Sequence, residues 1–144
     1  MMSYKTEKIF GRRESVHIVS PDFLALPKLE IDLANGITVK SGEFVGHDGQ
    51  LATLTDTART VFLVTEDSHY NDMLDRAKPS GVVEGFFGEM LIHTKVFEEG
   101  GTAFAPGDKV SIKDGKIGHV DGTNTIEVGE VVGRGADWLA IVLG

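Results

Sequence analysis

Several features that define common protein classes are missing from this chain of 144 residues. Cysteine is absent, which excludes disulfide bonds, thiolate metal ligands and a cysteine nucleophile. No apolar run approaches the roughly 18 residues that a membrane-spanning helix needs, and the opening MMSYKTEKIFGRRES lacks the apolar stretch of a signal peptide. We therefore expect a protein that stays in a reducing cytoplasm, or in a particle assembled there, and that does not bind a membrane.

Motifs of catalysis and cofactor binding are missing as well. The chain has no G-x-S-x-G elbow, no Walker A loop and no dinucleotide-binding fingerprint. Its histidines lack the H-x-x-x-H or H-E-x-x-H spacing that directs two ligands at one metal ion. They are isolated at His17, His47, His69, His93 and His119. We therefore expect no catalytic residue, no cofactor and no metal site, so that the chain is not an enzyme.

The densest group of acidic side chains lies between residues 66 and 75. Its members are Glu66, Asp67, His69, Asp72 and Asp75. Such oxygen donors suit a divalent cation, but they lack the alternating D-x-D-x-D-G register of a calcium loop, and the helix dipole attracts acids to a helix N-terminus. We interpret the cluster as the solvated start of one short helix, with apolar residues at helical spacing over 70–77, and a compact loop is the alternative.

Charge is distributed unevenly along the chain. The whole chain carries a net charge of -8 at pH 7, whereas residues 1–14 contain four basic and two acidic side chains. An acidic protein does not neutralise a phosphate backbone, which argues against nucleic-acid binding. We predict an extended N-terminal arm over residues 1–14 and a single β domain over 15–144. We interpret the basic arm as a segment that binds a partner through its charge. The alternative interpretation is that residues 1–14 are an ordinary solvated terminus.

The spacing of apolar residues predicts an all-β fold. Residues 16–19 and 29–33 are typical of strands, and Asn35-Gly36 favours a hairpin that leads into a strand at 37–39. Residues 61–64 are apolar on both faces and belong in the middle of a core. With further strands expected in 82–97, 126–132 and 138–143, we predict about nine or ten short antiparallel strands in a small β-barrel or sandwich, with at most one helix.

Two segments of the chain resemble each other, residues 42–51 and residues 107–117. Each begins with glycine and an acidic residue, continues as a strand, and reverses at an Asp-Gly turn that tolerates positive φ. Their spacing differs by one residue, so the similarity indicates a recurring hairpin rather than a proven repeat. The final segment, WLAIVL at 138–143, is apolar on both faces. We expect it inside the fold or inside a subunit interface, which leaves the N-terminal arm to reach a partner.

Short motifs near the C-terminus carry a resemblance to a known family. They are a Pro-Gly-Asp-x-Val opener at 106–110, a Lys-Asp-Gly-Lys turn at 113–116 and a Gly-Glu-Val-Val strand at 129–132. Through these motifs, residues 100–144 resemble the head-decoration (cement) proteins of tailed bacteriophages. The hairpin at 42–51 shows the same resemblance more weakly. The resemblance implies a structural virion protein, often a homotrimer, that is assembled in the host cytoplasm. Such a protein binds the major capsid protein on the capsid exterior and stabilises the shell against internal DNA pressure.

In this interpretation the arm supplies the binding residues, because it combines apolar anchors with basic charges. We expect contacts with the capsid or with an adjacent copy from Ile9, Phe10, Arg12 and Arg13. Alternatives are another phage head or tail component, a small β interaction domain with a concave apolar groove, and an enzyme whose site is completed between subunits. A trimer would favour decoration, a hexamer or dodecamer a ring-shaped component, and a monomer the interaction domain.

Overall fold

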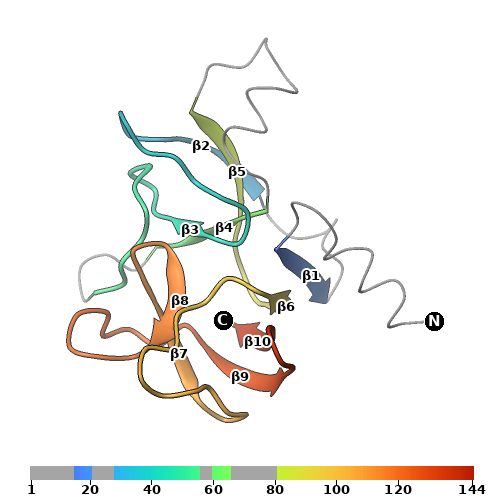
Figure 1. Cartoon of the computed structure of the whole chain (residues 1–144). Helices are drawn as coiled ribbons and strands as arrows, with labels where there is room; N and C mark the ends of the chain where they lie inside the picture. The colour runs from blue at the N-terminus through green and yellow to red at the C-terminus, as the bar shows by residue number, and fades with distance from the viewer. Residues whose placement is uncertain (1–14, 21–27, 56–59, 66–80) are drawn as a thin grey trace.

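The computed structural model describes residues 15–20, 28–55, 60–65 and 81–144. Within these ranges the chain forms ten strands and no helix, which confirms the predicted all-β class (Figure 1). The strands are β1 (Val16–Ser20), β2 (Lys28–Asp32), β3 (Phe44–Val45), β4 (Phe62–Val64), β5 (Val82–Phe86), β6 (Met90–Thr94), β7 (Lys109–Lys113), β8 (Lys116–His119), β9 (Gly129–Arg134) and β10 (Leu139–Leu143). The predicted arm and the predicted helix at 70–77 lie outside the described residues.

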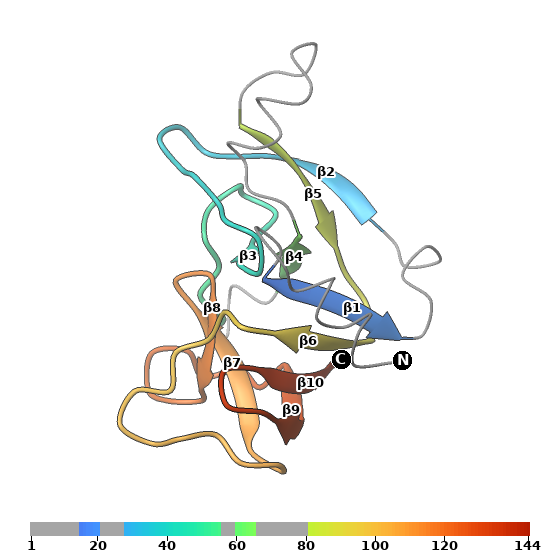
Figure 2. The ribbon, with the colours of Figure 1, turned by 45° about the vertical axis from the view of Figure 1, so that its right-hand side comes forward.

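The strands form two antiparallel sheets. The larger sheet has the order β1-β6-β10-β9-β7-β8, and the smaller has the order β2-β5-β4-β3. In the views of Figures 1 and 2 the smaller sheet lies above the larger, and residues 87–89 connect β5 to β6. Neither sheet closes on itself, so of the two predicted architectures the structure is sandwich-like and not a closed barrel.

The main core lies between the two sheets. Both sheets contribute large apolar side chains to it, and the phenylalanine of the loop before β7 completes it. The members include Phe44, Leu63, Phe86, Ile92, Phe104, Ile112, Ile117, Val131, Leu139 and Ile141. Since burial of apolar area stabilises folds in proportion to the area removed from water, this cluster holds the sheets together.

A second apolar cluster covers the opposite face of the smaller sheet. It consists of Ile31, Val39, Val45, Phe62, Val64 and Val83. In β4, Phe62 and Val64 belong to this second cluster whereas Leu63 belongs to the main core. The prediction that this strand is buried on both faces is therefore confirmed.

The hairpin predicted at Asn35-Gly36 forms only in part. The turn is present, because the N–H of Ile37 donates to the carbonyl oxygen of Ala34 (3.1 Å). However, residues 37–40 are not a strand, so this part of the prediction is wrong. The reason is that β2 pairs with β5 instead, and Val39 is buried in the second cluster from a loop.

The two sheets share one topological plan. In chain order β2, β3, β4 and β5 take the positions β2-β5-β4-β3, and β6, β7, β9 and β10 take the equivalent positions β6-β10-β9-β7. All of these neighbours are antiparallel. The larger sheet differs by two additions, β1 beside β6 and β8 beside β7. The fold therefore indicates an internal duplication of residues 28–86 and 90–143.

We call residues 28–86 the first half and residues 90–143 the second half. The turn before the second strand of each half supports the duplication. In the first half Gly42 has φ +92°, and its N–H donates to the carbonyl oxygen of Val64 (2.8 Å). The N–H of Val64 in turn donates to the carbonyl oxygen of Glu43 (2.9 Å). The carboxylate of Glu43 also accepts the N–H of Lys40 (2.9 Å), which closes the turn.

The second half repeats these bonds with different side chains. Gly107 has φ +97°, and its N–H donates to the carbonyl oxygen of Val131 (2.7 Å). The N–H of Val131 donates to the carbonyl oxygen of Asp108 (2.8 Å), and the Asp108 carboxylate accepts the N–H of Ala105 (2.9 Å). The recurring hairpin seen in the sequence is thus one part of a larger structural repeat.

The hairpins of the two halves also bind each other. The N–H of Phe44 donates to the carbonyl oxygen of Gly115, and the N–H of Gly115 donates to the carbonyl oxygen of Ala52, both at 2.8 Å. Gly115 has φ +82°, and a Cβ atom there would lie 2.8 Å from the Leu51 side chain. This position therefore requires glycine for its conformation and for its close approach.

We predict that Gly49→Ala destabilises the protein more than Gly36→Ala. Both glycines have positive φ (+77° and +83°), so alanine costs about 1 kcal/mol of backbone strain at either position. Only at Gly49 would the new Cβ also overlap the backbone of Asp32 and Ala34, whereas nothing lies within 4 Å at Gly36. Urea unfolding should show a loss of about 3 kcal/mol for Gly49→Ala. Equal losses for the two variants would contradict the assigned packing.

Candidate interaction surface

The outward side of the larger sheet carries exposed apolar side chains. Val19 is 40% exposed, Val132 is 48% exposed and Val142 is 45% exposed. Their chain neighbours Val131 and Ile141 are fully buried on the inward side, as the alternation of a strand requires. Exposed apolar side chains that gather on one face mark an interaction surface more often than scattered ones do.

The register of the sheet brings these side chains into one region. Leu91 of β6 lies opposite Val142 of β10, and His93 lies opposite Ala140. The indole of Trp138 stacks on the imidazole of His93 with ring centroids 5.1 Å apart. We define the outer patch as the outward side chains Val19, Leu91, His93, Val132, Trp138 and Val142.

The outer patch has little charge although the chain is acidic. Glu130, which lies opposite Val142 at the β9 side of the patch, is paired with Lys109 at 2.7 Å, and the same lysine also lies 3.5 Å from Glu127. Partial burial lowers the pKa of His93 below its ordinary value, because desolvation disfavours the imidazolium. The patch therefore presents a nearly neutral apolar area at pH 7, which another protein surface can cover without burying unpaired charge.

The described chain begins beside this patch, at the residue that follows the predicted arm. Ser15 is the first described residue; its N–H donates to Oγ of Ser41 (3.4 Å), and its carbonyl oxygen accepts the N–H of Lys95 (2.8 Å). β1 follows at once and pairs with β6 on one side, at the edge of the sheet. A partner that binds the arm is thereby anchored to the rigid sheet, and not to a loop.

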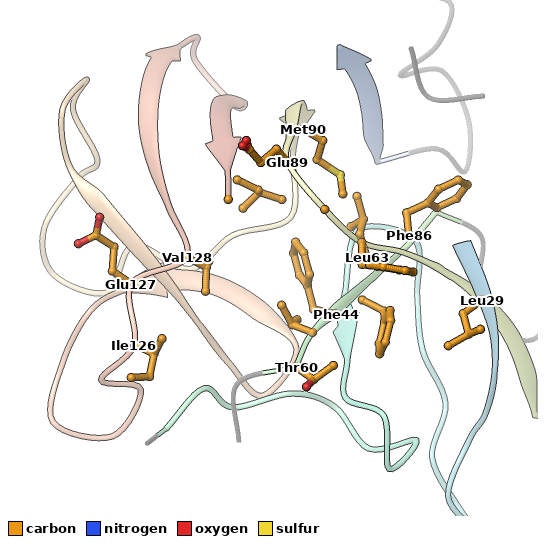
Figure 3. A pocket seen from close by; sticks show the side chains of 16 residues that line it. Leu29, Phe44, Thr60, Leu63, Phe86, Glu89, Met90, Ile126, Glu127 and Val128 are labelled. Atoms are coloured by element: carbon orange, nitrogen blue, oxygen red, sulfur yellow. The ribbon is translucent and has the colours of Figure 1, made fainter. Parts of the chain in front are cut away.

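A cavity of about 580 Å³ lies between the two sheets (Figure 3). Its lining is mainly apolar and comes from β4, from the β5–β6 connection and from the segment before β9: Leu29, Phe44, Val61, Phe62, Leu63, Phe86, Phe87, Met90, Ile126, Val128 and Leu143. The polar side chains of the lining are Thr60, Glu89 and Glu127. The volume is in the range of sites that take a small ligand or a few side chains of a partner.

The structure does not test the binding residues predicted from the sequence. Ile9, Phe10, Arg12 and Arg13 lie in residues 1–14, and the acidic cluster lies in residues 66–75, both outside the described ranges. His17 and His93, isolated in the sequence, are opposite each other in the β1–β6 register. Among the described residues no three His, Cys, Asp or Glu side chains gather as a metal site.

The outer patch and the cavity were not predicted from the sequence. One signal for the patch was present, because residues 138–143 are apolar on both faces and a buried strand needs only one face for a single core. For the cavity, the alternation of 29–33 suggested that Leu29 faces a core, but Leu29 is 51% exposed and lies at the cavity.

Comparison with known proteins adds no assignment: no family model, no curated protein and no solved structure matches the chain. In the part of the chain that the structure describes, no helix is long and apolar enough to cross a membrane.

We predict that His93 makes the protein less stable as the pH falls. Its pKa is lowered in the folded state, so the unfolded state binds the proton more tightly and stability is lost below the unfolded value of about 6.5. Urea unfolding at pH 7.5 and at pH 5.5 should show a smaller difference for His93→Gln than for the wild type. His47→Gln, at an exposed turn residue, is the matched control, and an unchanged pH difference in His93→Gln would refute the prediction.

Proposed function

We propose that this protein is a non-catalytic attachment protein that decorates the exterior of a phage capsid and stabilises the shell. The observation that carries the proposal is the outer patch, an uncharged apolar area that adjoins the edge strand β1. The basic segment 1–14 precedes this strand directly. The outer patch thus extends from the edge strand β1 across β6 and β10 to β9, and the described chain begins at Ser15, directly before β1.

The physical requirements of a cement protein agree with these features. A small domain offers limited area to one partner, so it gains avidity when several copies bind a repetitive surface together. A protein that binds the assembled shell and not its dissociated subunits stabilises the shell by mass action. Homotrimer formation and a virion location on the capsid exterior belong to the same proposal, with the major capsid protein as partner.

The outer patch is tested by Val132→Lys and Val142→Lys. Each substitution places a charge in the proposed interface, where it must be desolvated, so binding should weaken on the order of tenfold or more. The probe is heads assembled from a major capsid protein, which we expect to be encoded beside this chain, and binding is measured by co-sedimentation.

Val120→Lys is the matched control, because Val120 is 39% exposed but lies after β8, away from the patch. Thermal unfolding should be nearly the same for all three variants. Undiminished head binding by both patch variants would remove the basis for the proposal.

The role of the arm is tested by deletion of residues 1–14. The described residues begin at Ser15 and the first strand begins at Val16, so the shortened chain should remain folded, with the thermal transition of the full chain. It should no longer bind heads, because the basic and apolar residues with which the arm holds the shell or an adjacent copy are gone. Binding at full strength after the deletion would show that the arm plays no part in attachment.

A second candidate is a small β interaction domain without catalysis. The cavity between the sheets favours it, because this alternative requires a concave apolar site. Light scattering separates the candidates: a stable trimer supports decoration, a hexamer or dodecamer supports a ring-shaped head or tail component, and a monomer supports the interaction domain.

A further inference from the structure

We propose that the cavity between the sheets is the receptor for the N-terminal arm of a second copy of this chain. In this arrangement Ile9 and Phe10 fill the apolar interior, and the two arginines that follow them meet Glu89 and Glu127. The proposal concerns self-association. It therefore goes beyond the proposed capsid binding and is tested without any capsid.

The interior of the cavity suits apolar side chains. Figure 3 shows Phe44, Leu63 and Met90 among the side chains around it. Leu29 and Phe87 at the lining are 51% and 38% exposed, so large apolar groups remain in contact with water there. An isoleucine and a phenylalanine that enter this site would remove their own apolar area and that of the lining from water.

The polar side chains of the lining favour a basic partner. Glu89 is exposed, and the Glu127 side chain is 52% exposed. The carboxylate of Glu127 lies 3.5 Å from Nζ of Lys109, but this ammonium also binds Glu130 at 2.7 Å. One lysine thus faces two carboxylates, and Glu89 adds a third, so the lining and its surroundings are net negative.

The arm has the complementary order of side chains. Ile9 and Phe10 are followed by one glycine and then by Arg12 and Arg13. In an extended chain the apolar pair and the basic pair lie about 10 Å apart, so one can enter a cavity while the other remains at its margin. Arginine also suits this position because its guanidinium binds carboxylates through two donors.

The geometry of β1 indicates that the receptor belongs to another copy. The N–H of Lys95, the residue after β6, donates to the carbonyl oxygen of Ser15, and Met90 at the cavity lies at the opposite end of β6, about 17 Å away. Phe10 lies five residues before Ser15, a reach of about 17 Å only if the segment between them is fully extended in the direction of the cavity. β1 runs antiparallel to β6 and toward the Met90 end, so the chain before Val16 would have to reverse to approach its own cavity.

Arm exchange of this kind is a heterologous contact, since arm and cavity are different surfaces. Such contacts close into rings when the rotation between neighbours permits. Each copy then provides one arm and fills one cavity, so that in a closed ring no arm and no cavity is left unpartnered. A trimer linked in this way would present three outer patches as one unit.

Charge reversal tests the exchange by sedimentation equilibrium of the full chain. Arg12→Glu/Arg13→Glu and Glu89→Arg/Glu127→Arg should each weaken association on the order of tenfold or more, because like charges would meet at the cavity. A mixture of the two double variants should recover part of the association, since the arm of each now complements the cavity of the other; in a trimer two of the three junctions are then complementary and one is not.

The matched control is Glu84→Arg/Glu98→Arg. These glutamates are also exposed and paired with lysines, Glu84 with Lys28 and Glu98 with Lys116, but they do not line the cavity. Their reversal should leave association unchanged, and thermal unfolding should confirm that every variant is folded.

Two results would overturn the proposal: a wild-type chain that is monomeric at all concentrations, or association that neither double variant weakens. Head binding by the patch variants is measured separately, so a failure of arm exchange is distinguishable from a failure of the capsid proposal.

Discussion

The backbone bonds at Gly115 are the constraint on which the arrangement of the two sheets depends. Two residues of the first half bind this one residue of the second half. The N–H of Phe44 donates to the carbonyl oxygen of Gly115, and the N–H of Gly115 donates to the carbonyl oxygen of Ala52. The bonds fix the smaller sheet over the larger, and Phe44 is thereby placed in the main core and at the wall of the cavity. Because backbone groups that are buried must be paired, the core between the sheets cannot slide without breaking them.

An internal duplication accounts for the common strand order of the two sheets, and the proposed contacts lie where the two halves differ. The larger sheet has β1 and β8 as additional edge strands, whereas the edges of the smaller sheet are β2 and β3. β1 connects the arm to the outer patch, and the cavity forms where the halves join at residues 87–89. The proposed contacts thus use features that the repeat alone does not provide.

Local signals made much of the fold predictable, and long-range pairing accounts for the errors. The strand at 16–19, the doubly buried β4 and the Asp114-Gly115 hairpin each depend on a few adjacent residues, and all are present. The strand expected at 37–39 is absent because β2 finds β5 as its partner, some fifty residues away in the sequence. The repeat was visible only as a recurring hairpin, since the acids Glu43 and Asp108 make equivalent bonds with different side chains. The outer patch was hidden for a related reason: a strand that is apolar on both faces does not reveal which face is covered.

The charge of the protein constrains how copies of the chain can pack against one another. A chain with a net charge of -8 repels its neighbours, so stable packing needs contacts at which charge is absent or opposite. The outer patch meets the first condition, because its marginal Glu130 is paired with Lys109. The arm and the cavity together meet the second, with two arginines on one copy and Glu89 and Glu127 on the next. An apolar patch directed at the shell and a charged exchange between neighbours would therefore act at separate places on the molecule, and each would increase the effective concentration of the other.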